Sequence, residues 1–287
     1  MSDAPGGDGD VGENVGGDDN GDEPFLVAAS LSGESDATWA HAVAPHVDVA
    51  ILGGIALDPA SRAAARDLVA RDRSEFLPES PIRFVDEQLA AVADADVDVR
   101  PGFNLRSATV GPVREAAAVC ARHDAVCEVN AHCRQPELCA VGCGESLLRD
   151  VDRLREYVSA AAEAGATTSV KVRAEVSGVD LVAVAGAVAA AGADWLHVDA
   201  MDSESAIGDL RAAVDERGLG LTLVANNGIR DRSTVAEYAA YGADAVSVAR
   251  PTRPGADPAV LDTVAGAVAD WRAGSLMPLG ERPRRQR

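Results

Sequence analysis

Lys171 is the only lysine in this chain of 287 residues, and the rest of the Lys and Arg total of 26 is arginine. It lies in an apolar run, Ser169-Val-Lys-Val-Arg173. A compact ammonium on a thin stem can place a point charge in a narrow pocket, whereas a planar guanidinium needs more room. We therefore expect Lys171 to be a site residue. The alternative is that one lysine survived a general drift toward arginine.

A second polar segment reads Glu128-Val-Asn-Ala-His-Cys-Arg-Gln-Pro-Glu137. It places Cys133 three residues after Asn130, with His132 and Arg134 beside it. A thiol among such neighbours can act as an acid or a nucleophile, and an inert buried cysteine is the common alternative.

The chain has five cysteines, an odd number that argues against a disulfide framework. A zinc or iron–sulfur site would use Cys133, Cys139 and Cys143. Their spacings, with five and three intervening residues, lack the C-x2-C pair that is common in structural zinc sites. We expect no metal.

The composition is strongly acidic, with 46 Asp and Glu residues and a formal charge of -20. Such a surface stays hydrated when salt screens its self-repulsion, so we expect a halophilic protein in a salt-rich cytoplasm. The same charge opposes long-range attraction to nucleic acid. The sequence shows no apolar run of about 18 residues and no signal-peptide pattern, so we expect no membrane association.

Short β-branched runs alternate with alanine-rich helical stretches, which predicts a (β/α)8 TIM barrel over residues 24–275. An open doubly wound sheet is the competing topology, but no G-x-G-x-x-G follows the first strand. Residues 1–23 form an acidic arm and residues 276–287 a basic tail, and we expect both to be disordered. The predicted strands are 25–29, 47–52, 97–101, 126–130, 169–173, 195–199, 221–225 and 245–248. The clearest predicted helices are 111–122, 145–164, 180–191, 204–217, 234–241 and 258–271.

The functional residues of a barrel lie at the C-terminal ends of its strands. Donors outnumber acids at these ends, which suits an electron-rich ligand and not a hydrolytic metal centre. Gly228 and Arg250 follow the last two strands, where loops often hold a phosphate, although ordinary turns are the alternative. The polar strand-end residues are Ser30, Asn104, Asn130, His132, Cys133, Lys171, Arg173, Asp199, Asn226, Gly228 and Arg250.

Five motifs, in the same order, resemble those of flavin-dependent barrel reductases: the tRNA-dihydrouridine synthases and, more distantly, the dihydroorotate dehydrogenases. The resemblance covers about residues 25–252 and points to a short archaeal branch of the synthases. The matching segments are Ala29-Ser-Leu-Ser-Gly-Glu-Ser-Asp36, Asn130-Ala-His-Cys133, Val170-Lys-Val-Arg173, Ala225-Asn-Asn-Gly-Ile229, and Gly242-Ala-Asp with Ala249-Arg250.

The resemblance implies FMN as the cofactor and NAD(P)H as the electron donor. Lys171 would lie beside the N1/O2 edge of the flavin, where an ammonium favours the reduced anion. Cys133 would protonate uracil C5 while the flavin delivers hydride to C6. The other implied cofactor residues are Ser30, Asn104, Asn130, Asp199, Asn226, Gly228, Ala249 and Arg250, and the implied substrate residues are His132, Arg134 and Arg173.

Three positions depart from the synthase pattern. Arg134 replaces the proline after the cysteine, Ser30 replaces an early proline, and Asp199 stands where the synthases carry histidine. Asp199 would leave less positive charge near the flavin. The synthases also carry a helical tRNA-binding domain after the barrel, and little chain follows Gly274. The resemblance therefore supports flavin chemistry better than it supports tRNA.

Three functions remain open at this point. The first is an FMN-dependent reductase of a uracil ring in tRNA, with Arg106, Arg134, Arg173, Arg250 and Arg253 as a candidate RNA patch. The second is an FMN-dependent dehydrogenase of a free pyrimidine, in which Arg134 receives a carboxylate. The third is a barrel that binds a phosphorylated ligand without turning it over.

Overall fold

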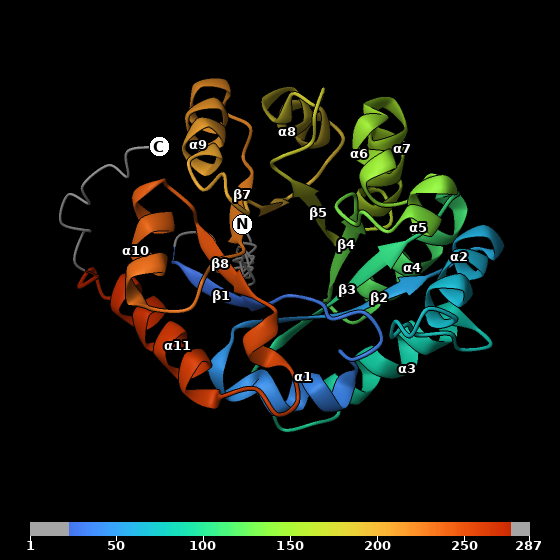
Figure 1. Cartoon of the computed structure of the whole chain (residues 1–287), viewed down its shortest axis with the longest axis horizontal. Helices are drawn as coiled ribbons and strands as arrows, with labels where there is room; N and C mark the ends of the chain where they lie inside the picture. The colour runs from blue at the N-terminus through green and yellow to red at the C-terminus, as the bar shows by residue number, and fades with distance from the viewer. Residues whose placement is uncertain (1–22, 277–287) are drawn as a thin grey trace, which may run out of the picture.

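The computed structural model describes residues 23–276. The predicted arm and tail lie, apart from Glu23 and Leu276, outside the described residues. Eight parallel strands close into a barrel in which β1 pairs with both β2 and β8. A ring of helices surrounds the strands (Figure 1), and the predicted (β/α)8 barrel is confirmed. None of the helices in the described part of the chain has the length and apolar character needed to cross a membrane.

The elements follow one another in strict alternation, with extra helices after β2 and β4. The strands are β1 (Phe25–Ala28), β2 (Val49–Ala56), β3 (Arg100–Arg106), β4 (Val126–Asn130), β5 (Thr167–Arg173), β6 (Trp195–Asp199), β7 (Thr222–Asn226) and β8 (Ala245–Val248). The α-helices are α1 (Ala37–Val43), α2 (Pro59–Val69), α3 (Pro81–Ala93), α4 (Val110–Arg122), α5 (Pro136–Ala140), α6 (Glu145–Arg149), α7 (Val151–Ala162), α8 (Leu181–Ala190), α9 (Ala206–Arg217), α10 (Arg232–Ala240) and α11 (Pro258–Arg272). Two short 3-10 helices are η1 (Ala44–His46) and η2 (Arg250–Thr252).

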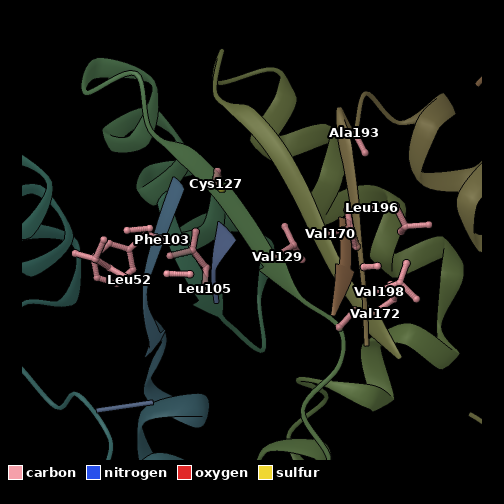
Figure 2. Close-up of a cluster of buried hydrophobic side chains, with 14 of the residues drawn as sticks. Leu52, Phe103, Leu105, Cys127, Val129, Val170, Val172, Ala193, Leu196 and Val198 are labelled. Carbon is pink, nitrogen blue, oxygen red and sulfur yellow. The ribbon is translucent and has the colours of Figure 1, made fainter. Parts of the chain in front are cut away.

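The main hydrophobic core lies between the strands and the helices. Side chains alternate across a strand, so every second residue points outward under a helix. Phe103, Val170 and Leu196 are among these outward residues, and each is fully buried (Figure 2). The inward residues form a second core at the N-terminal end of the barrel, and it consists of Val27, Val49, Ile51, Val126, Val224 and Ala245.

The third strand lies further along the chain than predicted. It was expected at residues 97–101 and spans Arg100–Arg106. Glycine is a poor strand former, so Gly102 disfavours a strand locally, but pairing with β2 and β4 holds these residues in the sheet. Asn104 and Arg106 are instead inside the strand and point into the barrel. Gly54 on β2 makes room for them, since a Cβ at Gly54 would lie 2.4 Å from Asn104 Oδ1.

The predicted helix over residues 145–164 is two helices. The chain breaks at Asp150, which lies between α6 and α7 and has φ -109° and ψ 79°. The Asp150 carboxylate accepts a hydrogen bond from Arg153 N at 3.2 Å, so it caps the start of α7. The break keeps α6 close to the loop that follows β4, where Glu145 N donates to Cys133 O at 2.8 Å.

Candidate functional site

The upper half of the barrel interior, at the C-terminal ends of the strands, is lined by polar side chains. The parallel register pairs Glu128 with Asn104 on one side and Ser169 on the other. It also pairs Lys171 with His197. Residues two apart on a strand share a face, so this polar layer lies directly above the apolar one. The strands thus bring side chains from distant parts of the sequence to one level.

Glu128 is the centre of this layer. Its carboxylate accepts hydrogen bonds from Asn104 Nδ2 at 2.7 Å, His197 Nδ1 at 2.6 Å and Ser169 Oγ at 3.3 Å. Burial alone would raise its pKa, but His197, the charge of Lys171 and these hydrogen bonds hold the pKa of Glu128 at about 2. The carboxylate is therefore ionised at neutral pH although it is fully buried.

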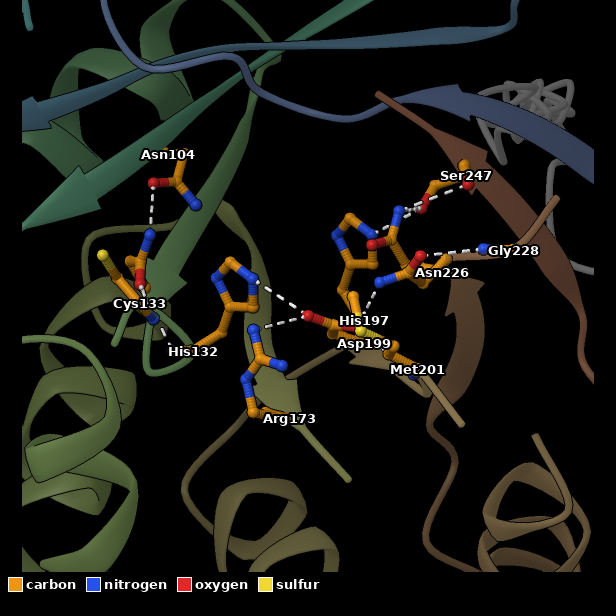
Figure 3. A network of polar contacts seen from close by, with 12 residues as sticks. Asn104, His132, Cys133, Arg173, His197, Asp199, Met201, Asn226, Gly228 and Ser247 are labelled. Carbon is orange, nitrogen blue, oxygen red and sulfur yellow. Dashed lines mark hydrogen bonds and ion pairs between the residues drawn. The ribbon is translucent and has the colours of Figure 1, made fainter. Parts of the chain in front are cut away.

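Hydrogen bonds run from Glu128 to both sides of the mouth, and Figure 3 shows the parts of both chains that lie beyond Glu128. On the β8 side, His197 Nε2 lies 2.7 Å from Ser247 Oγ, which accepts from Asn226 Nδ2 at 2.6 Å. On the β4 side, Asn130 Nδ2 donates to Asn104 Oδ1 at 2.9 Å. The contacts on each side of the carboxylate are thus linked into one chain across the barrel.

Lys171 lies against this chain without joining it. Its side chain is buried, with 4% of the residue exposed. Among the described residues its ammonium makes no hydrogen bond or ion pair. Burial lowers the pKa of Lys171, and the carboxylates of Glu128 and Asp199 oppose that effect. Its three donors are free for a ligand.

Asp199 gathers a second cluster closer to the opening. Its carboxylate contacts Arg173 Nη2 at 2.9 Å, His132 Nε2 at 3.2 Å and Asn227 Nδ2 at 3.0 Å. Burial raises its pKa, but the hydrogen bonds from His132 and Asn227 and the charge of Arg173 hold the pKa of Asp199 well below its usual range. Burial lowers the pKa of His132 to about 4.

Two buried atoms of this cluster have no partner in the described structure, His132 Nδ1 and Arg173 Nε. Because His132 is neutral and its Nε2 faces a carboxylate, Nε2 carries the proton and Nδ1 is a free acceptor. Arg173 Nε is a free donor. A buried polar atom without a partner is costly, so this pair indicates a place for ligand atoms.

A pocket of about 250 Å³ opens beside the network, between the loops that follow β7 and β8. Asn226 and Ser247 belong to both the pocket and the network. The guanidinium of Arg250 makes no hydrogen bond or ion pair within residues 23–276. An unpaired guanidinium on a pocket wall is suited to an anion. The pocket is lined by Met201, Asn226, Asn227, Gly228, Ile229, Ser247, Val248, Ala249, Arg250 and Pro251.

Cys133 lies at the edge of this site. Its backbone N–H donates to Asn130 Oδ1 at 3.1 Å, which ties the loop after β4 to the network. Its partly buried side chain packs against a small apolar cluster formed by α2 and α5, which includes Leu68 and Leu138. Cys139 Sγ donates to the Cys133 carbonyl at 3.4 Å. No group of three metal-binding side chains was found in the described part of the chain.

Most predicted site residues meet at the mouth. Arg134 is exposed and stands apart from the network, and Ser30 lies partly buried just after β1. Arg106, predicted for an RNA patch, is buried and pairs with Glu75 at 2.7 Å, so it cannot face RNA. Lys171, which lies against the network, and the hydrogen-bonded residues Asn104, Asn130, His132, Arg173, Asp199 and Asn226 were all predicted. Gly228, Ala249 and Arg250 line the neighbouring pocket.

Three members of the site were not predicted: Glu128, Ser247 and Asn227. Glu128 carried a signal, because a carboxylate two residues before Asn130 in an otherwise apolar strand must share its inward face. Ser247 carried none, since a serine in a strand is common. Asn227 has φ 87°, a left-handed conformation that asparagine tolerates better than most residues.

No family model matches the chain. A segment of 150 residues is 27% identical to an uncharacterized protein of Methanocaldococcus jannaschii, and the match covers 52% of this chain and 57% of that protein. The chain thus spans little more than half the length of this relative.

Solved structures share the fold at low sequence identity. Ligand-free DHODH from Eimeria tenella has a TM-score of 0.60 and 16% identity, over 87% of this chain and 85% of that one. A FabK mutant from Thermotoga maritima has a TM-score of 0.51 and 16% identity, over 80% and 63%. 3-Hexulose-6-phosphate synthase from Salmonella typhimurium has a TM-score of 0.51 and 18% identity, over 88% and 99%. These similarities establish the barrel architecture of the chain.

Proposed function

We propose that this protein is an FMN-dependent oxidoreductase that reduces a uracil ring, in the manner of a tRNA-dihydrouridine synthase. The observation that carries the proposal is Lys171, a buried ammonium without a hydrogen-bond partner in the described structure. Lys171 lies in the barrel mouth beside the side-chain amides of Asn104 and Asn130. The mouth adjoins the pocket that is lined by the unpaired Arg250. Donors suited to a flavin ring and a cation suited to its phosphate thus lie side by side.

The residues present fit FMN. Arg250 and the backbone around Gly228 and Ala249 would hold its phosphate. Lys171 and Arg173 Nε would donate to the electron-rich edges of a flavin or pyrimidine, and His132 Nδ1 would accept from a ring N–H. Asp199, which stands where the synthases carry histidine, is neutralised by Arg173 and therefore adds little negative charge to the mouth.

When bound and reduced by NAD(P)H, FMN would supply the hydride for ring C6. Cys133 would supply the proton for C5, and its thiolate would regain a proton from water. Asn130 accepts a hydrogen bond from the Cys133 backbone N–H, which ties the backbone that carries the thiol to the network.

The test uses purified protein loaded with FMN, NADPH as donor, and an unmodified tRNA transcript in concentrated KCl. We expect dihydrouridine in the product, detected by mass spectrometry of the digested RNA. A deletion strain of the source organism should likewise lack dihydrouridine that its parent contains. Flavin oxidation by free pyrimidines with no product in any RNA would reject the synthase activity.

The second candidate is an FMN-dependent dehydrogenase of a free pyrimidine. Arg134 favours it, because this exposed guanidinium has no partner in the described structure and could receive the carboxylate of an orotate-like ring. A DHODH is also among the structural neighbours. Flavin reduction by dihydroorotate that is lost in Arg134→Ala would favour this candidate. A protein that binds phosphate but never FMN would favour a non-catalytic barrel.

A further inference from the structure

The hydrogen bonds of the polar layer all donate toward Glu128. Asn226 donates to Ser247, and the Ser247 hydroxyl is then left to donate to the bare Nε2 of His197. From the other side, Asn130 donates to Asn104. Both chains end as donors on the Glu128 carboxylate. A carboxylate is the only side chain that accepts at both of its oxygens without donating, so this pattern requires an ionised acid at the centre.

The charge of Lys171 also requires an ionised acid at this position. Lys171 on β5 is paired with Asn130 and His197, and Glu128 lies two residues before Asn130 on the same face of β4. The charges of Glu128, Asp199 and Arg173 all act on Lys171. Asp199 is engaged by Arg173 at 2.9 Å, and burial and Lys171 lower the pKa of His197, which is therefore neutral. Glu128 is the remaining anion that can compensate a buried ammonium. An uncompensated charge at this depth would be strongly destabilising.

We propose that Glu128 is the positioning residue of the barrel mouth: its carboxylate keeps Lys171 charged and fixes the amide orientation of Asn104 and Asn130. The Asn104 amide cannot turn over while Nδ2 donates to Glu128, and Asn130 then has to present its oxygen to the loop of Cys133. One buried acid thereby sets the charge and the hydrogen-bond polarity of the groups that meet a ligand. The inference rests on the proposed function only for the identity of the ligand that these groups would bind.

The unique lysine makes the charge directly measurable. Lysine labelled at Cε gives a single side-chain NMR signal, whose titration reports the pKa of Lys171. In Glu128→Gln we expect the midpoint to fall by about one pH unit or more, a tenfold or larger loss of proton affinity. The matched control is Asp244→Asn, which removes a partly buried carboxylate at the N-terminal end of β8 and should leave the midpoint unchanged.

A second readout follows the hydrogen-bond direction. The Nδ1–H tautomer of His197 in the unaltered protein should change to Nε2–H in Glu128→Gln, because a glutamine can accept from Asn104 only by donating toward His197. Nitrogen NMR of the histidine rings distinguishes the two forms. An unchanged Lys171 midpoint together with an unchanged His197 tautomer would overturn the proposal.

If Glu128→Gln does not fold alone, the double variant with Lys171→Met should fold, because the uncompensated ammonium is gone. A double variant that also stays unfolded would contradict the charge-balancing role. None of these measurements needs a flavin or a substrate. A protein that fails to bind FMN but shows both changes would refute the proposed function and leave the role of Glu128 intact.

Discussion

The lower and upper halves of the barrel interior are built on the same strands and differ completely in chemistry. β4 presents Val126 to the lower half and Glu128 to the upper half, and β6 presents Trp195 and then His197. Inward-facing residues two positions apart on one strand are therefore apolar at the N-terminal end of the barrel and polar at its C-terminal end. The lower half is a packed core, whereas the upper half keeps donors that lack partners.

This difference separates stability from chemistry along the barrel axis. The apolar layer stabilises the closed sheet by burying side chains from most of the strands. The polar layer stabilises less, because hydrogen bonds between buried groups only replace those that were made with water. It holds Lys171, His132 and Arg173 in fixed places, each with an atom available to a ligand. Substitutions in the two halves should therefore fail in different ways.

The largest effect is expected in the upper half, for Cys133→Ala. If Cys133 is the proton donor, this variant should keep FMN and its reduction by NADPH while substrate turnover falls about 10²- to 10⁴-fold. Stopped-flow absorbance separates flavin reduction from reoxidation by substrate. Cys139→Ala is the matched control, since it removes a thiol of the same loop whose hydrogen bond goes to the Cys133 carbonyl and not to the Cys133 thiol. Equal damage from the control would assign the effect to the loop and not to the Cys133 thiol.

In the lower half, Ile51→Ala should lower the free energy of unfolding by about 2–5 kcal/mol, because it leaves a cavity among fully packed side chains. FMN binding by the remaining folded protein should be unaffected. Urea unfolding in concentrated KCl provides the measurement. Val69→Ala, at a position on α2 that is 43% exposed, is the control and should change the value by less than about 0.5 kcal/mol. A weakened flavin site in Ile51→Ala would contradict the separation of the two halves.

A smaller effect should appear in the pH dependence of stability. The pKa of His132 is about 4 in the folded protein and 6.5 in a free side chain, so the unfolded chain binds more protons between these values. His132 therefore costs stability as the pH falls from 6.5 toward 4. His132→Gln should flatten the unfolding curve in this window, whereas Val224→Ala in the lower half should shift it by a constant amount. Parallel curves for both variants would mean that His132 is not buried in its neutral form.

The sequence predicted the barrel and most of its mouth because both rest on local signals. Alternation of strands and helices identifies the fold. Asn130 and Asn226 were found because each stands at the end of a recognisable strand, and Lys171 because it is the only lysine of the chain. The boundaries of β3 were missed: the predicted strand ended at Pro101, whereas pairing with β2 and β4 carries the strand through Gly102 to Arg106.

What could not be predicted depends on register between strands. Asn104 and Glu128 are 24 residues apart in the chain and meet only because β3 and β4 pair in one register. The same holds for the burial of Arg106, which was expected on the surface and instead pairs with Glu75 inside the mouth. Local sequence shows which residues are polar, but the closed sheet decides which of them face one another.

The most direct test of the central claim is FMN binding by the purified protein, followed by absorbance and ultrafiltration in both dilute buffer and concentrated KCl. We expect a yellow protein that holds one FMN per chain, and Lys171→Met should fold normally while it binds or reduces FMN more weakly. A colourless protein that takes up no added FMN at any salt concentration would contradict the account.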